Sequence, residues 1–141
     1  MQALVLIAHG SRRQASNTEV TNLVSGLKQT GRDRYQIIEA GFLEIATPSI
    51  PEAVESCIEY GATSVVIVPY FLAAGRHVTE DIPRIVKLIT EQHRGVNIHV
   101  AEHIGVAGSM NQLILDSAGG VHKQAGLYRA GELISNIPDR L

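Results

Sequence analysis

Two histidines stand where the chain is expected to turn after an apolar run. His9 directly follows the run of residues 4–8, and His77 follows the run of residues 64–69 after a segment rich in small residues. In an open parallel sheet, ligands bind at the carboxyl ends of the strands. Imidazoles that reach this edge from two different strands indicate metal binding or proton transfer.

The residues beside these histidines favour an anionic ligand. Gly10 allows a sharp backbone turn, and Ser11, Arg12 and Arg13 place a hydroxyl group and two cations in the same loop. A loop of this kind before a helix attracts anions. Arg76 adds a cation to the second loop, whose small residues favour a mobile lid. Taken singly, each of these side chains also fits a solvated surface.

Glu44 is the third candidate, because it ends the segment 41–44 at another expected strand end. Two histidines and one carboxylate form a common open metal site, which leaves positions for a further ligand. His9, His77 and Glu44 are therefore candidate ligands, with Glu44 also a candidate proton acceptor. The alternative role of Glu44 is to interact with the positive end of the next helix.

The remaining histidines and the single cysteine carry weaker signals. His93 is expected in solvent at a helix end, His99 within a strand, and His103 near the rim of the same cleft. His122 lies in the C-terminal tail. Cys57 falls on the apolar stripe of a helix and is expected to fill the core.

Apolar periodicity predicts four strands, at residues 4–8, 35–43, 64–69 and 96–101. Helical stripes follow each strand, over residues 20–27, 50–58, 82–89 and 107–117, the last with Met110, Leu113 and Ile114 inward. Ser16 with Glu19, and Ser49 with Glu52, have the spacing of a capping box. Thr79 or Asp81 is expected to cap the third helix.

Alternation of strands and helices predicts an α/β fold with parallel pairing. We expect a three-layer α/β/α sandwich with a four-stranded parallel sheet in the flavodoxin-like order 2-1-3-4. Residues 1–118 form the expected domain. Residues 119–141, with a weak helical stretch over 127–134, form a tail that packs on this domain or on a dimer partner.

Composition narrows the classes of partner. The chain has 141 residues, a net charge of −2 and no tryptophan, which argues against nucleic-acid binding. No apolar run reaches the roughly 18 residues of a membrane span, and the first run is interpreted as a strand rather than a signal peptide. A single cysteine excludes an internal disulfide. The expected location is the cytoplasm.

Five short segments together resemble one known family. They are residues 9–12 (His-Gly-Ser-Arg), 42–44 (Phe-Leu-Glu), 51–53 (Pro-Glu-Ala), 68–72 (Val-Pro-Tyr-Phe-Leu) and 75–78 (Gly-Arg-His-Val). In this order, over roughly residues 3–116, the chain resembles the sirohydrochlorin chelatases. These are small class II chelatases that insert cobalt, nickel or iron into tetrapyrrole precursors of cobalamin, coenzyme F430 or sirohaem.

The resemblance implies that His9 and His77 bind the incoming divalent metal, with Glu44 as ligand or proton acceptor. Cobalt is the first expectation, with nickel or iron as alternatives, and no organic cofactor is expected. Larger members of the family carry two such lobes around a cleft. The resemblance therefore implies a homodimer that rebuilds the cleft by symmetry.

A tetrapyrrole with many carboxylates needs cations and an apolar wall around its site. Ser11, Arg12, Arg13 and Arg76 are expected to meet the carboxylates, and Phe71 and Leu72 are expected to flank the ring.

Two other functions remain open. His9 with Gly10 is similar to the Arg-His-Gly start of histidine phosphatases, but Ala8 stands where their phosphate-binding arginine lies. The other alternative is a non-catalytic carrier of metal or tetrapyrrole.

Overall fold

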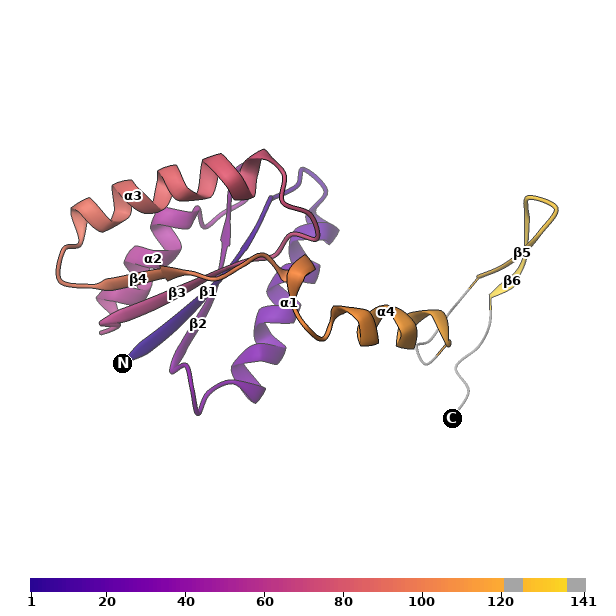
Figure 1. Ribbon diagram of the computed structural model, residues 1–141, viewed down its shortest axis with the longest axis horizontal. Coiled ribbons are helices and arrows are strands. Elements are labelled where there is room, and N and C mark those ends of the chain that lie inside the picture. Colours follow the sequence, from indigo (N-terminus) through magenta and orange to yellow (C-terminus); the bar gives the residue numbers. More distant parts are fainter. Residues whose placement is uncertain (121–125, 137–141) are drawn as a thin grey trace. The chain divides into compact units, whose positions relative to one another are not determined.

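The computed structural model describes residues 1–120 and 126–136 (Figure 1). Strands and helices alternate along the chain, as expected. The elements are β1 (Gln2–Ala8), α1 (Gln14–Thr30), β2 (Ile37–Phe42), α2 (Ile50–Glu59), β3 (Ser64–Pro69), the π-helical turn η1 (His77–Asp81), α3 (Ile82–Gln92), β4 (Asn97–Val100), the 3-10 turn η2 (Ile104–Val106), α4 (Met110–Ala118), β5 (Gly126–Arg129) and β6 (Glu132–Asn136).

Two compact units divide the chain, Met1–Val106 and Ala107–Leu141. The first unit contains the sheet of β1 to β4 and the helices α1 to α3. The second contains α4 and the hairpin of β5 and β6. The expected domain of residues 1–118 thus includes one helix, α4, that the structure groups with the second unit.

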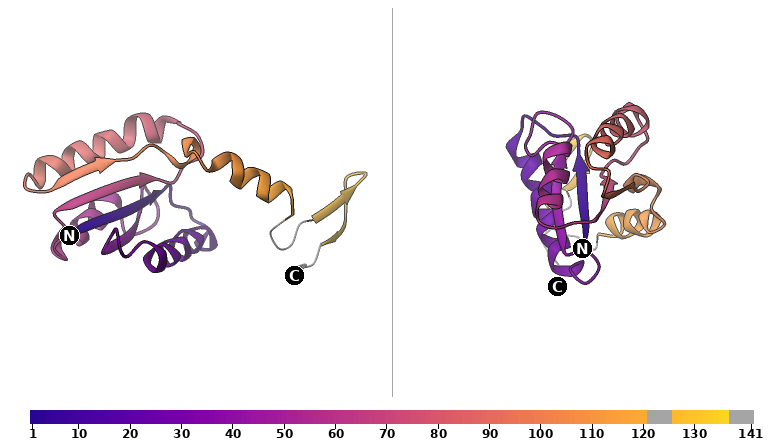
Figure 2. Two further views of the ribbon diagram at one scale, coloured as in Figure 1. Left: turned by 60° about the horizontal axis from the view of Figure 1, so that its bottom comes forward. Right: turned by 90° about the vertical axis from the view of Figure 1, so that its left-hand side faces the viewer.

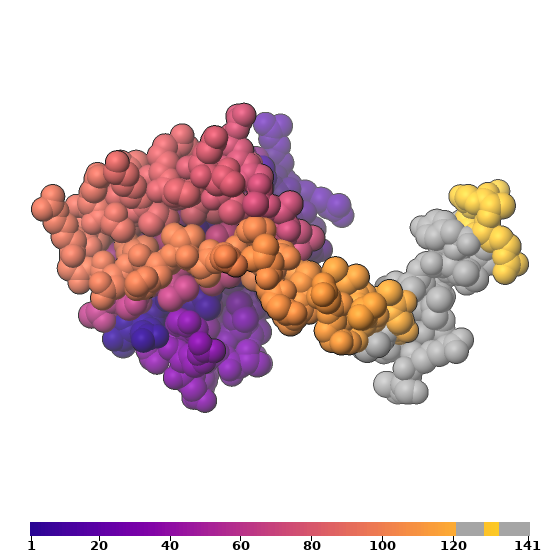
Figure 3. Space-filling view, viewed as in Figure 1, coloured from indigo at the N-terminus to yellow at the C-terminus, as the bar shows by residue number. Residues whose placement is uncertain are grey.

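The sheet of the first unit has the order β2-β1-β3-β4, and all of its strand pairs are parallel. The predicted fold class and strand order are therefore confirmed. β1 lies between β2 and β3, so the loop that follows β1 is flanked by the loops that follow both neighbours. The outer strand β4 is mostly exposed, and its segment lies open in the space-filling view (Figure 3).

Apolar side chains cover both faces of this sheet. Alternate residues of β1 point to opposite faces, as the period of a strand requires. Ala3, Val5 and Ile7 pack in the core with α2 and α3. Leu6 and Ala8 pack on the other face, with α1. Figure 2 shows α1 and α3 on opposite sides of the strands, which gives the three layers.

The three helix starts differ in how well the sequence predicted them. At α2 the capping box is present, because the Ser49 side chain accepts from the Glu52 N–H and the Glu52 carboxylate accepts from the Ser49 N–H. At α1 the predicted cap at Ser16 is wrong, since Arg13 is the N-cap and Ser16 already lies inside the helix.

At α3, Asp81 occupies the N-cap position, which agrees with one of the two predicted residues, but its side chain makes no capping hydrogen bond. Thr79 and Asp81 lie inside the continuous turn that runs from η1 into α3. The Thr79 hydroxyl donates to the Gly75 carbonyl, and the Asp81 carboxylate contacts His77. Both side chains are therefore engaged elsewhere.

The second unit departs from the predicted helix at residues 127–134. β5 and β6 form an antiparallel hairpin over this stretch instead. Ala130 and Gly131 both have positive φ angles, 54° and 83°, which suits a two-residue hairpin turn. In α4, Leu113 and Ile114 are exposed rather than inward.

No helix in the described part of the chain combines the length and apolar character of a membrane-crossing segment.

Candidate active site

The ends of β1 and β2 bring His9 and Glu44 together. His9 follows β1, and Glu44 lies two residues beyond β2. Backbone bonds continue past the strands, since the Leu43 N–H donates to the Ala8 carbonyl and the Glu44 N–H donates to the His9 carbonyl. His9 Nε2 lies 2.8 Å from Glu44 Oε1. Sheet pairing therefore positions two of the three predicted site residues directly.

Gly10 makes this close approach possible. Its φ is +94°, and a Cβ atom placed there would lie 1.9 Å from the carbonyl oxygen of Glu44. A side chain at this position would clash with the backbone of the neighbouring loop. Gly10 is thus required both for the turn after His9 and for the contact between the two loops.

The segment after Glu44 is a tight turn with an unusual backbone angle. The Ala46 N–H donates to the Glu44 carbonyl at 2.7 Å, which closes a γ-turn around Ile45. Ile45 has a φ of +71°, although its branched side chain disfavours this region. The Ile45 side chain is exposed, and Ile45 follows Glu44 directly in the chain. Backbone strain of this kind is often found at functional sites.

His77 comes to the same place from β3. Its ring centroid lies 4.7 Å from that of His9, with the two planes 31° apart. The ring of Phe71 lies 6.2 Å from the His77 ring. His77 begins the π-helical turn η1, whereas the sequence predicted a loop. The rings of His9 and His77 are therefore neighbours at the carboxyl ends of β1 and β3.

A carboxylate that the sequence did not suggest contacts His77. Asp81 Oδ2 lies 2.7 Å from His77 Nδ1, and Arg84 Nη2 lies 3.2 Å from Asp81 Oδ1. The Asp81 side chain is only 19% exposed. The available signal was the spacing of four residues, which brings side chains together in a helical turn.

The described residues, 1–120 and 126–136, contain no group of three or more His, Cys, Asp or Glu side chains arranged to hold a metal ion. The histidines instead form two pairs with carboxylates, His9 with Glu44 and His77 with Asp81. The three-ligand set of His9, Glu44 and His77 stays a prediction.

The arginines predicted to bind an anionic ligand are all exposed. Arg12 and Arg13 are exposed in the loop after β1. Arg76, next to His77 in the chain, lies 3.6 Å from Glu80. The Ser11 hydroxyl accepts from the Arg13 N–H.

Asn17, which the sequence reading overlooked, holds the loop after β1. This buried side chain of α1 accepts from the Ser11 N–H and donates to the Ser11 carbonyl. A hollow of about 440 Å³ opens beside these groups, between this loop and the turn after β2. Its lining includes Ser11, Arg12, Asn17 and Ile45.

Phe71 and Leu72, the predicted apolar wall, differ in exposure. Phe71 is half-buried and packs against the core, whereas Leu72 is 74% exposed. The chain after β4 holds this segment, since the Gly105 N–H donates to the Phe71 carbonyl. A Cβ at Gly105 would lie 1.7 Å from the Leu72 carbonyl oxygen.

The residues with weaker sequence signals mostly lie where they were expected. His93 ends α3, and its N–H donates to the Ile89 carbonyl. His99 is exposed on β4, and His103 lies beyond it, half-buried. Cys57 is buried in the core, where burial raises its thiol pKa to about 11. His122 lies outside the described residues.

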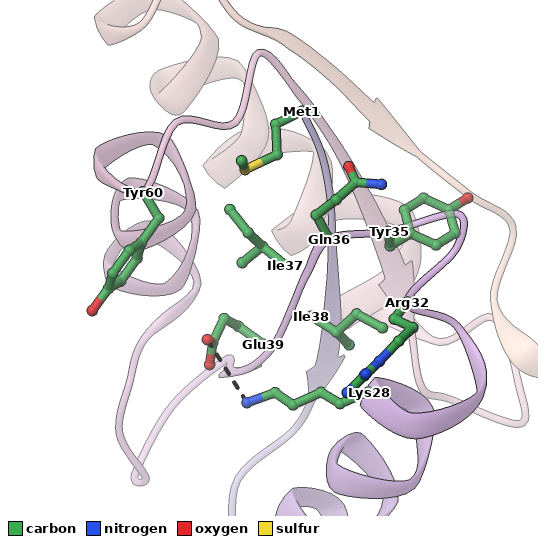
Figure 4. Close-up of a pocket in the computed structure, with 9 residues that line it drawn as sticks. All are labelled: Met1, Lys28, Arg32, Tyr35, Gln36, Ile37, Ile38, Glu39 and Tyr60. Carbon is green, nitrogen blue, oxygen red and sulfur yellow. Dashed lines mark ion pairs between the residues drawn. The ribbon is translucent and has the colours of Figure 1, made fainter.

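A second hollow lies at the opposite end of the sheet. It measures about 550 Å³ and is lined by residues near the starts of β1 and β2 (Figure 4). Lys28 and Glu39 form an ion pair across it at 4.0 Å. Ligands of open parallel sheets bind at the carboxyl ends of strands, so this hollow is not the expected site.

Known proteins resemble this chain in sequence. The CbiX family model matches residues 3–119. The sirohydrochlorin cobaltochelatase of Methanocaldococcus jannaschii is 44% identical over 93 residues, which are 66% of this chain and 64% of that protein. The chloroplastic sirohydrochlorin ferrochelatase of Arabidopsis thaliana is 33% identical over 102 residues, or 72% of this chain and 44% of that protein. The chain therefore spans less than two thirds of these relatives' length.

Solved structures resemble it in fold. A CbiX protein of cobalamin biosynthesis from Marinobacter aquaeolei VT8 has a TM-score of 0.67 and 28% identity, covering 84% of this chain and 95% of that one. The sirohydrochlorin chelatase SirB from Bacillus subtilis subspecies spizizenii, solved in complex with cobalt, has a TM-score of 0.76 and 25% identity. That match covers 85% of this chain and 50% of SirB.

Proposed function

The chain belongs to the CbiX family, and from this premise we propose that it inserts a divalent metal into sirohydrochlorin or a related tetrapyrrole. Cobalt is the first choice, with nickel and iron as alternatives. The step would belong to the formation of cobalamin or sirohaem. The observation that carries the proposal is that the ring centroids of His9 and His77 lie 4.7 Å apart, with the Glu44 carboxylate in contact with His9 Nε2.

Metal insertion requires the exchange of two protons for one dication. The tetrapyrrole loses two pyrrole N–H protons as the metal ion binds its nitrogens, so the enzyme needs both metal ligands and proton acceptors. His9 and His77 supply imidazole ligands, and Glu44 accepts protons beside them. The metal is a substrate that has to leave. An open set of ligands suits its transfer better than a closed cage, which is typical of structural sites.

Charge around the strand ends supports binding of a tetrapyrrole polycarboxylate. Arg12 and Arg13 are exposed in the segment that follows β1, and Arg76 is exposed in the segment that follows β3. Guanidinium groups pair with carboxylates through two parallel hydrogen bonds. Ser11 lies in the hollow beside Arg12, and Phe71 and Leu72 supply apolar contacts for the ring.

A homodimer is the second part of the proposal. The chain corresponds to half of SirB but to nearly all of the Marinobacter protein. Two copies related by a twofold axis would place two sets of His9 and His77 around one cleft. Sedimentation velocity over a dilution series tests this, with activity measured at the same concentrations. A monomer with full activity at all dilutions contradicts the shared cleft.

The enzymatic proposal is tested by multiple turnover. Protein at one tenth of the sirohydrochlorin concentration is mixed with Co²⁺, Ni²⁺ or, without oxygen, Fe²⁺, and the metallated product is followed by absorbance. Catalysis predicts product in excess of protein, fastest with Co²⁺. Product that stops at one equivalent indicates a carrier.

Site variants test the residues. We expect His9→Ala and His77→Ala each to lower kcat/KM by roughly 100-fold or more, as for loss of a general base or ligand. Glu44→Gln is expected to lower kcat. His99→Ala, an exposed histidine on β4, is the matched control and keeps the wild-type rate. Folded His9 and His77 variants with wild-type insertion would remove the proposed site.

A further inference from the structure

Asp81 and His77 form a short, partly buried contact, which the predicted role of Asp81 as a helix cap does not explain. Asp81 Oδ2 lies 2.7 Å from His77 Nδ1, and the two side chains are 19% and 40% exposed. A hydrogen bond of this length to a carboxylate is a strong one. It determines how the His77 ring is oriented.

The backbone is shaped to make this contact. The Ile82 N–H donates to the His77 carbonyl, which closes the π-helical turn His77–Asp81. Turns of this kind are rare and frequently lie at functional sites. The second oxygen of Asp81 is held by Arg84, one turn further along, at 3.2 Å. Both carboxylate oxygens are therefore engaged, one by His77 and one by a cation.

The chemistry of a carboxylate then decides where the imidazole proton lies. An ionised carboxylate only accepts hydrogen bonds, so a neutral His77 carries its proton on Nδ1. Nε2, on the other side of the ring, is then the unprotonated nitrogen with a lone pair for a metal ion. His9 differs, because Glu44 contacts its Nε2 atom.

We propose that Asp81 is a positioning residue that holds His77 in the Nδ1–H tautomer, with Nε2 presented to the metal substrate, and that Arg84 holds Asp81 in place. This inference rests on the proposed function for its consequence in metal insertion. Its structural part, the tautomer, is independent of that function. Carboxylates that accept a hydrogen bond from metal-binding histidines in this way fix the tautomer and the orientation of the ring.

Nitrogen-15 NMR of the histidine rings tests the tautomer in the metal-free protein. At a pH where His77 is neutral, the wild type is expected to show a protonated Nδ1 and an unprotonated Nε2, assigned by comparison with His77→Gln. In Asp81→Ala the acceptor is gone, and in Asp81→Asn the amide can donate to Nδ1. Both variants are expected to shift the population towards Nε2–H.

Metal binding and kinetics test the consequence. Titration with Co²⁺ alone is expected to show affinity roughly 10- to 100-fold weaker in Asp81→Ala, the usual effect of losing such a carboxylate. The KM for the metal is expected to rise while the KM for the tetrapyrrole stays unchanged, and Asp81→Glu is expected to recover part of the loss. Glu91→Gln, which removes the same charge from α3, is the control with wild-type values.

The outcomes of these experiments distinguish failure of the Asp81 role from failure of the proposed metal insertion. If the wild type shows Nε2–H, or if folded Asp81→Ala keeps wild-type Co²⁺ affinity, the role of Asp81 is wrong whatever the reaction. If the tautomer and the affinity change as expected but wild type inserts no metal, the proposed function fails and the role of Asp81 stands.

Discussion

Replacement of Gly10 by alanine tests the way in which the fold joins His9 to Glu44. The Ala Cβ would lie 1.9 Å from the Glu44 carbonyl oxygen, whereas real Cβ contacts stay beyond about 3.0 Å. One of the two loops therefore has to move by more than about 1 Å. A shift of this size stretches the 2.8 Å contact between His9 Nε2 and Glu44 Oε1 beyond hydrogen-bonding distance.

The cost has two parts. A φ of +94° is disfavoured for any residue with a Cβ, by about 1–2 kcal/mol, and the clash with the backbone adds a comparable amount. We expect Gly10→Ala to lower the free energy of unfolding by about 2–4 kcal/mol. For a chain of this size that lowers Tm by roughly 10 °C. Misplacing a reacting group by about 1 Å costs roughly 100-fold in rate, so kcat/KM should fall by that factor.

The assays are thermal unfolding and cobalt insertion, both measured well below the Tm of the variant. Gly26→Ala is the matched control, because nothing lies within 4 Å of its Cβ and alanine favours the helix α1. This control is expected to gain about 0.5–1 kcal/mol and keep full activity. A Gly10→Ala protein with wild-type Tm and wild-type insertion would refute the proposed dependence of the site on this contact.

Three further predictions follow from individual contacts. Ile45→Gly relieves the positive φ of +71° and is expected to raise the free energy of unfolding by about 1 kcal/mol in urea titrations; a loss of stability would mean that the turn is not strained. Ser49→Ala removes the cap of α2 and should cost about 1 kcal/mol. Because bonds to Ser49 lower the Glu52 pKa below 4.5, their contribution is present above pH 4.5 and lost as the pH falls through the lowered value, so the difference between the two proteins should shrink in acid. Cys57, with its raised thiol pKa and burial, should resist iodoacetamide at pH 8 until the protein unfolds, as mass spectrometry can measure; rapid labelling of the native protein would contradict its core position.

Periodicity predicted the sheet well because apolar runs and their spacing reflect burial directly. The central strand β1 is buried on both faces and appears as a continuous apolar run, and helical stripes separate the strands. Turn geometry was harder. The segment from Leu127 to Ile134 was predicted as a weak helix, although it forms a hairpin. Its turn residues are Ala130 and Gly131 rather than the usual Asn-Gly, so the sequence lacked the common hairpin signal.

The predicted helix starts were wrong where nearby side chains had other hydrogen-bond partners. Ser16 and Glu19 have capping spacing, but α1 begins earlier and Asn17 uses its amide to hold the loop at Ser11. Asp81 was interpreted as a cap because α3 was expected to begin beside it. Once the helical turn begins at His77, the same spacing of four residues brings the carboxylate to the imidazole. In both cases the residue at which the helical turn begins decided which partner the side chain met, and the capping spacing alone did not show where that turn begins.

The convergence of His9 and His77 follows from the strand order. From β1 the chain crosses by α1 on one face to β2, and from β3 it crosses by α3 on the other face to β4. The crossovers diverge between β1 and β3, which opens the crevice where ligands bind in such folds. Adjacent strands lie about 4.8 Å apart, close to the 4.7 Å between the two rings. The loops therefore only have to carry the two imidazoles forward from neighbouring strands, and their fine orientation is left to Glu44 and Asp81.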